Sequence, residues 1–342
     1  MRDEPKGGTV LVTGGAGYIG SVLCPKLLSR HRVVIVDTLL FGERPLAGFR
    51  DHPGLTLVRG DIRDDDLLAR VLREQKFDAI YHLAAISNDP CSELDPQLTL
   101  SVNRAATERV MHAAKAHGVA RFINASSASV YGLKDETDVT EELTLDPLTL
   151  YARCKAETEQ VLNALCDDAF CGVSVRSATV CGHSPRLRLD LTINILTYHA
   201  VTQREIRVFG GTQMRPNIHI EDLTDFYVAL YDLPAGKLNG RAFNVSTQNA
   251  TVRELAELVR AEVDPQLPIA TVPTADNRSY HLSAARAQRE LGFAPRRSLS
   301  DAVRDLKRAL EDGRVPDPGG AIYRNIEVMK DAVAMRAMAH PG

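Results

Sequence analysis

Three polar residues near the middle of the chain could together remove a proton from an alcohol. Tyr151 and Lys155 are four residues apart in the segment YARCK, so a helix there places both side chains on one face. A phenol has an ordinary pKa of about 10, and a neighbouring ammonium favours its ionised form, which lets the tyrosine act as a base near neutral pH. Ser127, at the end of a predicted strand, would orient the alcohol through a hydrogen bond. Taken alone, a Tyr-x-x-x-Lys pair is more often an accident of a helix surface.

A glycine-rich turn near the N-terminus supports the interpretation that Tyr151 and Lys155 remove a proton from an alcohol. The segment TVLVTGGAGYIG contains the apolar run 10–12, typical of a buried parallel strand, followed by Gly14, Gly17 and Gly20. This spacing, between a strand and a helix, is typical of a dinucleotide-binding turn. Gly14 permits the tight turn, Gly17 lets the backbone approach a pyrophosphate, and Gly20 lets the helix pack closely on the sheet. The helix N-terminus then attracts the phosphates.

Two acidic residues help to define the dinucleotide. Asp37 ends a second apolar run, residues 33–37, where a carboxylate accepts hydrogen bonds from the adenosine ribose and repels a 2′-phosphate. No arginine follows at once, so NAD is favoured over NADP; the alternative is an aspartate that merely starts a turn. Asp61, in GDIRD, could meet the adenine edge or could cap a helix over residues 65–74. The positive nicotinamide ring of NAD would favour the Tyr151 phenolate further, and Lys155 would also hold a ribose hydroxyl.

The surrounding elements alternate between strand and helix, which predicts an α/β fold. Ala84 and Ala85 are small residues that leave room for a flat cofactor at the sheet edge. The alternation implies a Rossmann-like, doubly wound parallel sheet with helices on both faces. Further strands are predicted at 55–58, 78–85, within 120–132 and at 172–180, and helices at 21–30, 65–74, 94–117 and 150–167.

Beyond residue 181 short strands mix with helices and proline-rich joints, which indicates a smaller C-terminal α/β lobe that binds the substrate. Strands are predicted at 206–209 and 242–245, and helices at 189–202, 220–233, 251–263 and 299–311. We therefore expect an NAD-binding domain over residues 1–181 that shares some elements of about 206–250, a mainly substrate-binding lobe over 182–315, and a loosely attached tail over 316–342.

The composition is that of an ordinary globular protein. Of 342 residues, 44% are hydrophobic and 25% charged, and the net charge is −3. The charge gives no reason to expect nucleic acid or a membrane surface as a partner. No signal peptide or membrane span is evident, so a cytoplasmic location is expected. The six cysteines are scattered without metal-ligand spacing, which favours reduced thiols over disulfides or a metal site.

The chain resembles the extended short-chain dehydrogenase/reductases that act on nucleotide sugars, and among them the UDP-galactose 4-epimerase-like members. The motifs that carry the resemblance are TGGAGYIG, Asp37, GDIRD, HLAA, SSASVYG, YARCK and RPNIHIED. The resemblance implies tightly held NAD, a C-terminal lobe that grips a nucleotide-diphosphate sugar, and Ser127, Tyr151 and Lys155 as catalytic triad. It also implies a homodimer formed through the helices at 94–117 and 150–167.

The family pattern assigns further residues to the cofactor and to the substrate. The expected cofactor-binding residues are Gly14, Gly17, Tyr18, Ile19, Asp37, Asp61, Ile62, Leu83, Ala84, Ala85, Asn103, Tyr151, Lys155 and Val180. The expected substrate-binding residues are Ser87, Ser127, Ala128, Thr179, Arg186, Arg188, Asn194, Arg215 and Arg278.

For several of these residues the sequence also allows a role other than substrate binding. Arg215 and Arg278 suit a diphosphate because a guanidinium binds two oxygens at once, and the alternative is a solvated surface arginine. Arg186 and Arg188 could recognise an acidic or phosphorylated sugar, or could simply pair with Asp190. In RPNIHIED, His219 is expected to be a buried structural residue.

Departures from the family pattern narrow the reaction. Sugar dehydratases of this superfamily carry acidic residues after the catalytic serine or threonine, whereas this chain has Ala128 and Ser129. Without that acid and base, oxidation and re-reduction at C4 is favoured, which predicts a nucleotide-sugar 4-epimerase. The usual Arg-x-x-Asn-x-Tyr-Gly motif reads Arg176, Thr179, Cys181 and Gly182, and Thr179 lacks the amide. The alternatives are a 4,6-dehydratase or 4-ketosugar reductase, and a catalytically silent NAD-binding regulatory protein.

Overall fold

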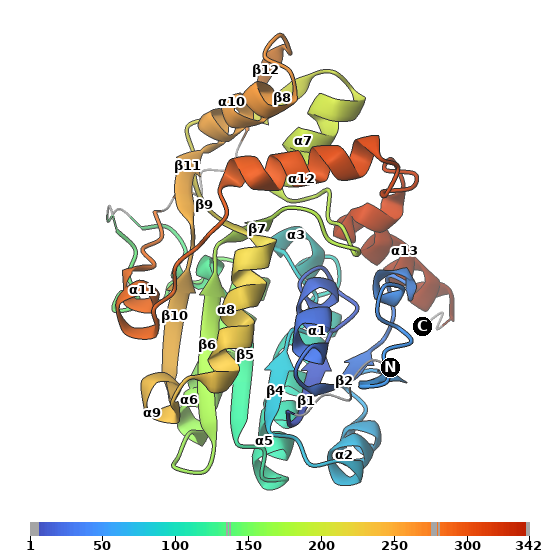
Figure 1. Ribbon diagram of the computed structural model, residues 1–342, viewed down its shortest axis with the longest axis vertical. Coiled ribbons are helices and arrows are strands. Elements are labelled where there is room, and N and C mark those ends of the chain that lie inside the picture. The colour runs from blue at the N-terminus through green and yellow to red at the C-terminus, as the bar shows by residue number, and fades with distance from the viewer. Residues whose placement is uncertain (1–6, 135, 137, 275–278, 280, 340–342) are drawn as a thin grey trace.

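The core of the protein is a seven-stranded sheet in which every neighbouring pair is parallel. The computed structural model describes residues 7–134, 136, 138–274, 279 and 281–339. The strand order is β10-β6-β5-β4-β1-β2-β3 (Figure 1), which confirms the doubly wound α/β prediction. The strands are β1 (Thr9–Thr13), β2 (Arg32–Asp37), β3 (Leu55–Arg59), β4 (Ala79–His82), β5 (Arg121–Ser127), β6 (Cys171–Ser177) and β10 (Arg241–Val245).

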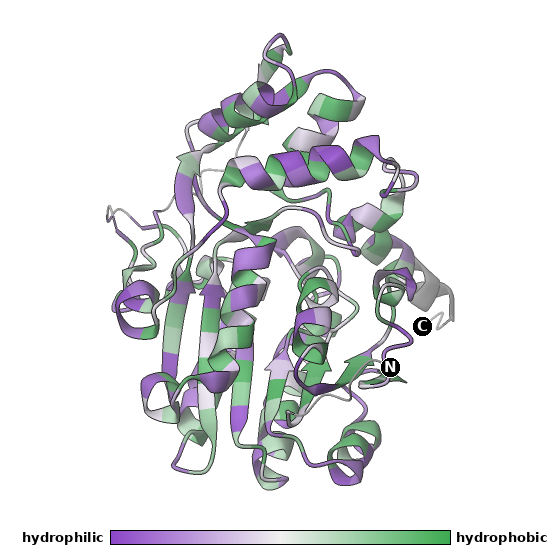
Figure 2. Ribbon diagram, viewed as in Figure 1, coloured by the Kyte–Doolittle hydropathy of each residue, from purple (hydrophilic) through white to green (hydrophobic). Residues whose placement is uncertain are grey.

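Helices cover both faces of this sheet because successive strand residues point to opposite sides. Val10 and Val12 of β1 pack in the cluster that contains α1 (Gly20–Leu28) and α8 (Ile220–Asp232). Leu11, between them, packs in the opposite cluster. Figure 2 shows the inner strands as largely hydrophobic, as expected for a sheet buried on both sides. The opposite cluster draws on the helices α2 (Asp65–Glu74), α5 (Thr107–Ala116) and α6 (Leu150–Leu165).

The second lobe has its own core, formed by three helices over short strands. The predicted strand at 172–180 is divided there: β6 ends at Ser177, and β7 begins at Thr179 and pairs with β9 instead. The chain thus passes from the main sheet to the second lobe at Ala178. This lobe contains the strands β7 (Thr179–Cys181), β8 (Ile206–Phe209), β9 (Met214–His219), β11 (Gln248–Thr251) and β12 (Ile269–Val272), and the helices α7 (Thr192–Thr202), α10 (Val252–Val263) and α12 (Leu299–Glu311). The short helix α9 (Ala235–Leu238) packs against β6, and α11 (Ala285–Leu291) packs against β10.

The single helix predicted over residues 94–117 is confirmed, because the chain is helical without a break from Pro96 to Ala116. It consists of α4 (Pro96–Thr99), a π-helical stretch η2 (Leu100–Ala106) and α5, and a short helix α3 (Asp89–Ser92) precedes it. Asp95 starts α4 by accepting a hydrogen bond from the backbone N–H of Leu98 at 2.9 Å, and Pro96 occupies its first turn, where a missing N–H costs nothing. The local pattern of apolar residues does not reveal the π-helical stretch. The described residues also form the 3₁₀ turns η1 (Arg44–Leu46), η3 (Ala128–Tyr131) and η4 (Ala321–Tyr323).

Residues 323–329 pack against the rest of the protein, contrary to the expectation of a loosely attached tail over 316–342. The Tyr323 carbonyl accepts a hydrogen bond from Leu189 at 2.8 Å, and the side chains of Asn325 and Met329 are buried. Asn325 begins α13 (Asn325–Ala339), which lies beside α3. These contacts are long-range, so local sequence patterns gave no indication of them.

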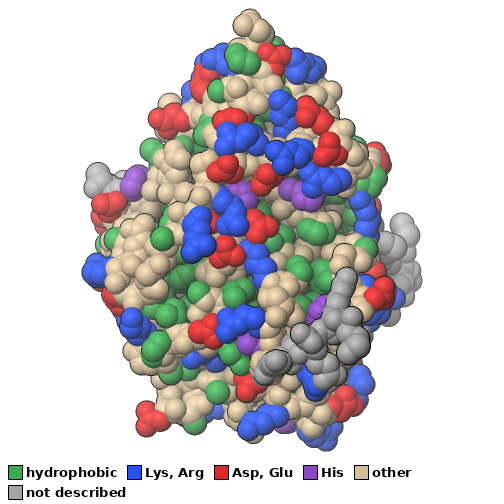
Figure 3. Space-filling view, in the orientation of Figure 1, with side chains coloured by type: hydrophobic (Ala, Val, Ile, Leu, Met, Phe, Trp, Pro, Cys, Tyr) green, Lys and Arg blue, Asp and Glu red, His purple; other side chains and the backbone are tan. Residues whose placement is uncertain are grey.

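The surface carries both signs of charge. On the face in Figure 3, basic and acidic side chains are interspersed rather than separated by sign. Within the described residues, every helix is too short or too polar to cross a membrane.

Candidate active site

A cavity of about 880 Å³ opens at the carboxyl ends of the parallel strands and extends to the second lobe. In open α/β sheets this end of the strands is the place where ligands bind. Most of the predicted site residues line it. They are Gly14, Gly17, Tyr18, Ile19, Asp37, Asp61, Ile62, Leu83, Ala84, Ala85, Ser87, Ser127, Tyr151, Lys155, Thr179, Val180, Arg186, Arg188 and Arg215.

The backbone of the glycine turn lines the cavity, where a ligand can approach it closely, and side chains at Gly14 or Gly20 would collide with neighbouring backbone atoms. Gly14 has a φ of +77°, and a Cβ there would lie 2.7 Å from the amide nitrogen of Ala84. A Cβ on Gly20 would lie 2.6 Å from the Gly14 carbonyl oxygen, so α1 packs tightly against the turn. Gly17 lines the cavity. The turn and Gly20, the first residue of α1, both line the cavity, and a cavity at a helix N-terminus fits a diphosphate.

The carboxylate of Asp37 is held at the cavity edge by two backbone groups. It accepts hydrogen bonds from Ala16 at 2.9 Å and from Leu39 at 2.8 Å. These two contacts fix the side chain next to the glycine turn, and burial raises the pKa of this carboxyl. Each oxygen keeps a lone pair that can accept a ribose hydroxyl.

Asp61 lines the cavity but does not cap α2. Its carboxylate accepts a bidentate hydrogen bond from Arg63, with distances of 2.7 to 3.1 Å. The cap is Asp64, whose side chain accepts a hydrogen bond from Leu67 at 3.0 Å. Arg63 also lines the cavity and was missed in the sequence, although it belongs to the GDIRD motif.

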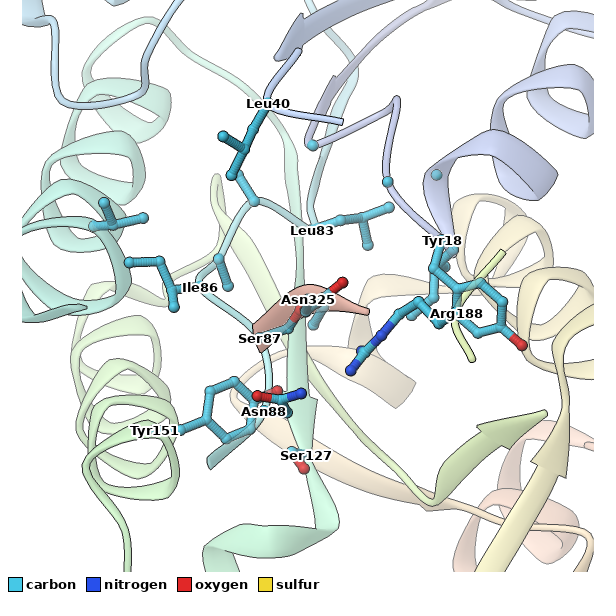
Figure 4. A pocket seen from close by; sticks show the side chains of 18 of the residues that line it. Tyr18, Leu40, Leu83, Ile86, Ser87, Asn88, Ser127, Tyr151, Arg188 and Asn325 are labelled. Carbon is cyan, nitrogen blue, oxygen red and sulfur yellow. The ribbon is translucent and has the colours of Figure 1, made fainter. Parts of the chain in front are cut away.

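Tyr151, Lys155 and Ser127 line the same part of the cavity. Tyr151 and Lys155 lie on the first turns of α6, and Ser127 ends β5. The Lys155 ammonium is buried, lies 5.7 Å from the centre of the Tyr151 ring, and donates a hydrogen bond to the Ala125 carbonyl at 2.6 Å. Burial lowers the pKa of Lys155 to about 8, so the amine is a cation at neutral pH. Figure 4 shows Tyr151 and Ser127 in one pocket.

The start of α6 is fixed by the loop that follows β4. Thr149 caps α6 by accepting a hydrogen bond from Ala152 at 3.2 Å, and its hydroxyl donates to Asp89 at 2.6 Å. Asn88, next to Asp89, has a φ of +75° and lines the same cavity as Tyr151 (Figure 4). A positive φ is costly for a residue with a side chain, and such residues gather at functional sites. The sequence gave no indication of Asn88.

Ser127 belongs to a short run of serines with different roles. Its Oγ accepts hydrogen bonds from the amide and hydroxyl of Ser129, at 3.2 and 3.0 Å. Ser126 instead donates to the buried carboxylate of Glu159, which also forms a bidentate ion pair with Arg176. Arg176, from the altered family motif, therefore supports the sheet beneath the cavity.

The two arginines of the 186–190 loop have different partners. Arg188 pairs with Asp190 at 2.9 Å, as one of the two sequence interpretations allowed. The Arg186 guanidinium donates to the carbonyl of Leu187 at 2.6 Å and to the side chain of Asn325. Asn325 lines the cavity as well and appears near its centre in Figure 4. Its sequence neighbourhood gave no signal for this position.

Three predicted site residues that the structure describes do not line the cavity. Asn103 binds the backbone of Ile86 at 2.7 and 2.8 Å, Asn194 binds Gly182, Arg188 and Tyr18, and Ala128 is buried. Both amides are fully engaged in supporting the cavity walls. Arg278 lies outside the described residues.

His219 is buried, as expected. Its Nδ1 accepts a hydrogen bond from the backbone N–H of Glu221 at 3.1 Å and caps α8.

Comparison with known proteins places the chain in a family. The model of the NAD-dependent epimerase/dehydratase family matches residues 10–246, more than half of the chain. The chain belongs to this family. UDP-glucose 4-epimerase 4 of Oryza sativa subsp. japonica is 31% identical over 327 residues, which cover 87% of this chain and 88% of the relative.

Solved structures of the family share the fold. The UDP-glucuronic acid 4-epimerase of Bacillus cereus, in complex with UDP-glucuronic acid and NAD, has a TM-score of 0.80 and 25% identity, over 89% of this chain and 99% of that one. The dTDP-glucose 4,6-dehydratase of Streptomyces venezuelae, with NAD bound, has a TM-score of 0.80 and 27% identity, over 91% and 99%.

NAD is the cofactor of this epimerase/dehydratase family member, and the cavity residues fit it. The glycine turn and the α1 N-terminus suit its diphosphate, Asp37 suits a ribose, and Lys155 with Tyr151 lies further along the cavity. Substitution of Gly14 would close the turn against Ala84.

Proposed function

We propose that this protein is a nucleotide-sugar 4-epimerase that oxidises and re-reduces the sugar at C4 with tightly bound NAD. One observation carries the proposal. Tyr151, Lys155 and Ser127 line one cavity, while the two residues after Ser127 supply no carboxylate: Ala128 is buried and Ser129 is engaged with the Ser127 hydroxyl. The site thus has the groups for removing a hydroxyl proton and lacks, at that place, an acid for eliminating water.

In the proposed reaction Tyr151 removes the proton of the C4 hydroxyl. The Lys155 ammonium favours the phenolate, because an adjacent cation stabilises the charged form, and Ser127 orients the C4 oxygen through a hydrogen bond. NAD, when bound, accepts the hydride from C4 and returns it. After the 4-keto sugar has rotated in the cavity so that the opposite face of C4 meets the cofactor, Tyr151 returns the proton to the C4 oxygen. Because Tyr151 acts as the base in the oxidation and as the acid in the reduction, its protonation state is restored at the end of each cycle.

The proposed substrate is a nucleotide-diphosphate sugar. The comparison proteins that carry this family's fold are named for such compounds, and one was solved with UDP-glucuronic acid. In this chain Arg188, Arg215, Ser87 and Thr179 line the part of the cavity that the second lobe borders. Arginine is suited to a diphosphate since its planar fork binds two oxygens.

A 4,6-dehydratase is the alternative that a specific observation favours. Asp89 lines the cavity near the start of α6 and is a carboxyl that could serve as an acid, and a dTDP-glucose 4,6-dehydratase matches the chain as well as an epimerase does. A catalytically silent NAD-binding protein fits less well, because Ser127, Tyr151 and Lys155 are all present.

The decisive experiment is incubation of the purified protein with UDP-, GDP-, CDP- and dTDP-hexoses, followed by proton NMR. The proposal predicts one sugar converted to its C4 epimer, without added cofactor and without consumption of NADH. A 4-keto-6-deoxy product would identify a dehydratase, and stoichiometric NADH consumption would identify a reductase. No turnover of any sugar, with NAD affinity unchanged in Tyr151→Phe, would favour the silent protein.

We also propose a homodimer in which α5 and α6, which pack against each other, form a four-helix interface with the same helices of a second copy. Light scattering coupled to size-exclusion chromatography tests this, and a monomeric mass at assay concentration would contradict it.

A further inference from the structure

Arg186 is a buried cation without an acidic partner in the described part of the chain. Only 3% of its surface is exposed, and its guanidinium donates to a carbonyl and to the Asn325 amide oxygen, both of which are neutral. Its Nε is buried with no hydrogen-bond partner. Burying a charge without a counter-ion is costly, and accordingly burial lowers the pKa of Arg186 to about 10, which still leaves it charged at neutral pH.

The nearest carboxylate on the same loop is already engaged. Asp190 accepts a bidentate hydrogen bond from Arg188, at 2.9 and 3.1 Å, and further bonds from the Asn325 backbone and the Asn88 side chain, both at 3.2 Å. Arg186, which lines the cavity, is therefore available to an anion that enters from outside. An anionic group bonded to a buried guanidinium forms a strong, charge-assisted interaction.

The neighbours of Arg186 place it at the cofactor end of the cavity. Its guanidinium carbon lies 3.7 Å from the ring centre of Phe41, four residues after Asp37. Its backbone N–H contacts the hydroxyl of Ser21 in the first turn of α1 at 3.4 Å, and Ser184 bonds the Tyr18 carbonyl at 2.8 Å. Tyr18 and Ser21 belong to the glycine turn and to α1, the elements that fit the NAD diphosphate, and Phe41 follows Asp37, which suits a ribose.

Asn325 connects this arginine to Ser87 and to Asp190. Its Oδ1 accepts from Arg186, its Nδ2 donates to Ser87 at 3.1 Å, and its backbone N–H donates to Asp190. The side chain is 4% exposed, and because it is a neutral acceptor it holds the guanidinium without cancelling the charge. We propose that Asn325, at the start of α13, is a positioning residue that holds Arg186 against the diphosphate of NAD. The C-terminal helix thus takes part in retaining the cofactor, whichever sugar reaction the enzyme performs.

The test uses the full-length holoenzyme and the exchange of its bound NAD with an excess of labelled NAD. In Asn325→Asp the new carboxylate keeps the shape and the hydrogen bond but neutralises Arg186. We expect NAD to exchange about tenfold faster, while the melting temperature of the protein stays the same or rises. If Asn325 had only a structural role, NAD exchange in Asn325→Asp should stay at the wild-type rate as long as the melting temperature is not lowered. Arg186→Met should accelerate exchange by at least as much; if it does not fold, the aspartate variant still decides.

Two further measurements distinguish whether Arg186 binds the diphosphate of NAD or the diphosphate of the substrate. UDP titrated calorimetrically into the same holoenzymes should bind with unchanged affinity, within about twofold. Arg324→Met, which removes the adjacent cation over the Tyr198 ring, is the matched control and should leave exchange unchanged. The proposal is overturned if UDP binding weakens while NAD exchange stays constant, because Arg186 then serves the substrate diphosphate. It is equally overturned if neither ligand is affected.

Discussion

The Nζ atom of Lys155 lies 5.7 Å from the centre of the Tyr151 ring, inside the protein and one helical turn away along α6. Burial lowers the pKa of this amine to about 8. The ammonium is therefore present below about pH 8 and is lost as the pH rises further. Because the cation favours the Tyr151 phenolate, we expect kcat to decrease above about pH 8. The pH profile of kcat from pH 6 to 10 checks this; a profile that keeps rising to pH 10 would contradict it.

Substitution of Tyr151 by phenylalanine removes the proposed acid and base without removing the ring. We expect kcat to fall by about 10²- to 10⁴-fold, the usual contribution of a positioned proton-transfer group, while bound NAD is retained. Steady-state kinetics and the absorbance of released NAD measure the two effects. Tyr231→Phe, in α8, is the control and should keep full activity. Retention of wild-type kcat in Tyr151→Phe would remove the basis of the proposed chemistry.

Gly14→Ala tests the turn that fits the cofactor. The left-handed φ of +77° and the 2.7 Å approach to the Ala84 backbone should cost about 1–3 kcal/mol of folding stability and release NAD. Gly48→Ala is the matched control, since its Cβ would have nothing within 4 Å. Thermal unfolding and NAD content of both variants give the comparison. Equal NAD content in the two would show that the turn tolerates a side chain.

The sequence predicted the parts of the fold that depend on local pattern. The apolar runs that became β1, β2, β3 and β5 and the helix α12 appear where the periodicity placed them. The glycine turn, Asp37, Tyr151 and Lys155 meet in one cavity because parallel strands end at the same edge of the sheet. The catalytic and ligand roles of these residues remain predictions.

The errors arose where distant contacts decide the structure. The helix expected at 94–117 forms from Pro96 to Ala116, but the π-helical stretch in which Asn103 reaches the backbone of Ile86 was not predicted. Asn325 meets Ser87, which is 238 residues away along the chain, and no local pattern encodes such a contact. Asn194 and Asn103 have the polarity of ligand-binding residues, but their amides are used by neighbouring backbone groups.

His82 makes the protein sensitive to acid. Its ring is buried between Thr13 and Thr107, at 2.8 and 3.0 Å, and burial lowers its pKa to about 3. Between about pH 6.5, the ordinary pKa of histidine, and pH 3 the unfolded chain binds more protons at this position than the folded one. The contribution of His82 to the free energy of unfolding therefore decreases as the pH falls through that window. We expect His82→Gln to flatten the dependence of unfolding free energy on pH from 6.5 to 4, measured by urea titration, whereas His117→Gln, at an exposed position, should not.

The buried ion pair beneath the cavity should be far more important for stability than a surface pair. Arg176 and Glu159 are 2.6 Å apart and almost fully buried, so Arg176→Met leaves an unpaired buried carboxylate and should cost about 3–5 kcal/mol. Arg253→Met breaks an exposed pair with Glu257 and should cost less than about 1 kcal/mol. Chemical denaturation of both variants measures the difference, and similar costs would contradict the interpretation.

The most direct test of the proposed function follows a deuterium label placed at C4 of the nucleotide sugar that the panel identifies. The holoenzyme is incubated with this sugar in ordinary water, and the product is analysed by NMR. We expect a C4 epimer that retains deuterium at C4, with no NADH consumed and with turnover by Tyr151→Phe reduced by about 10²- to 10⁴-fold. Deuterium in a C6 methyl group, or its loss to water during epimerisation, would contradict the account.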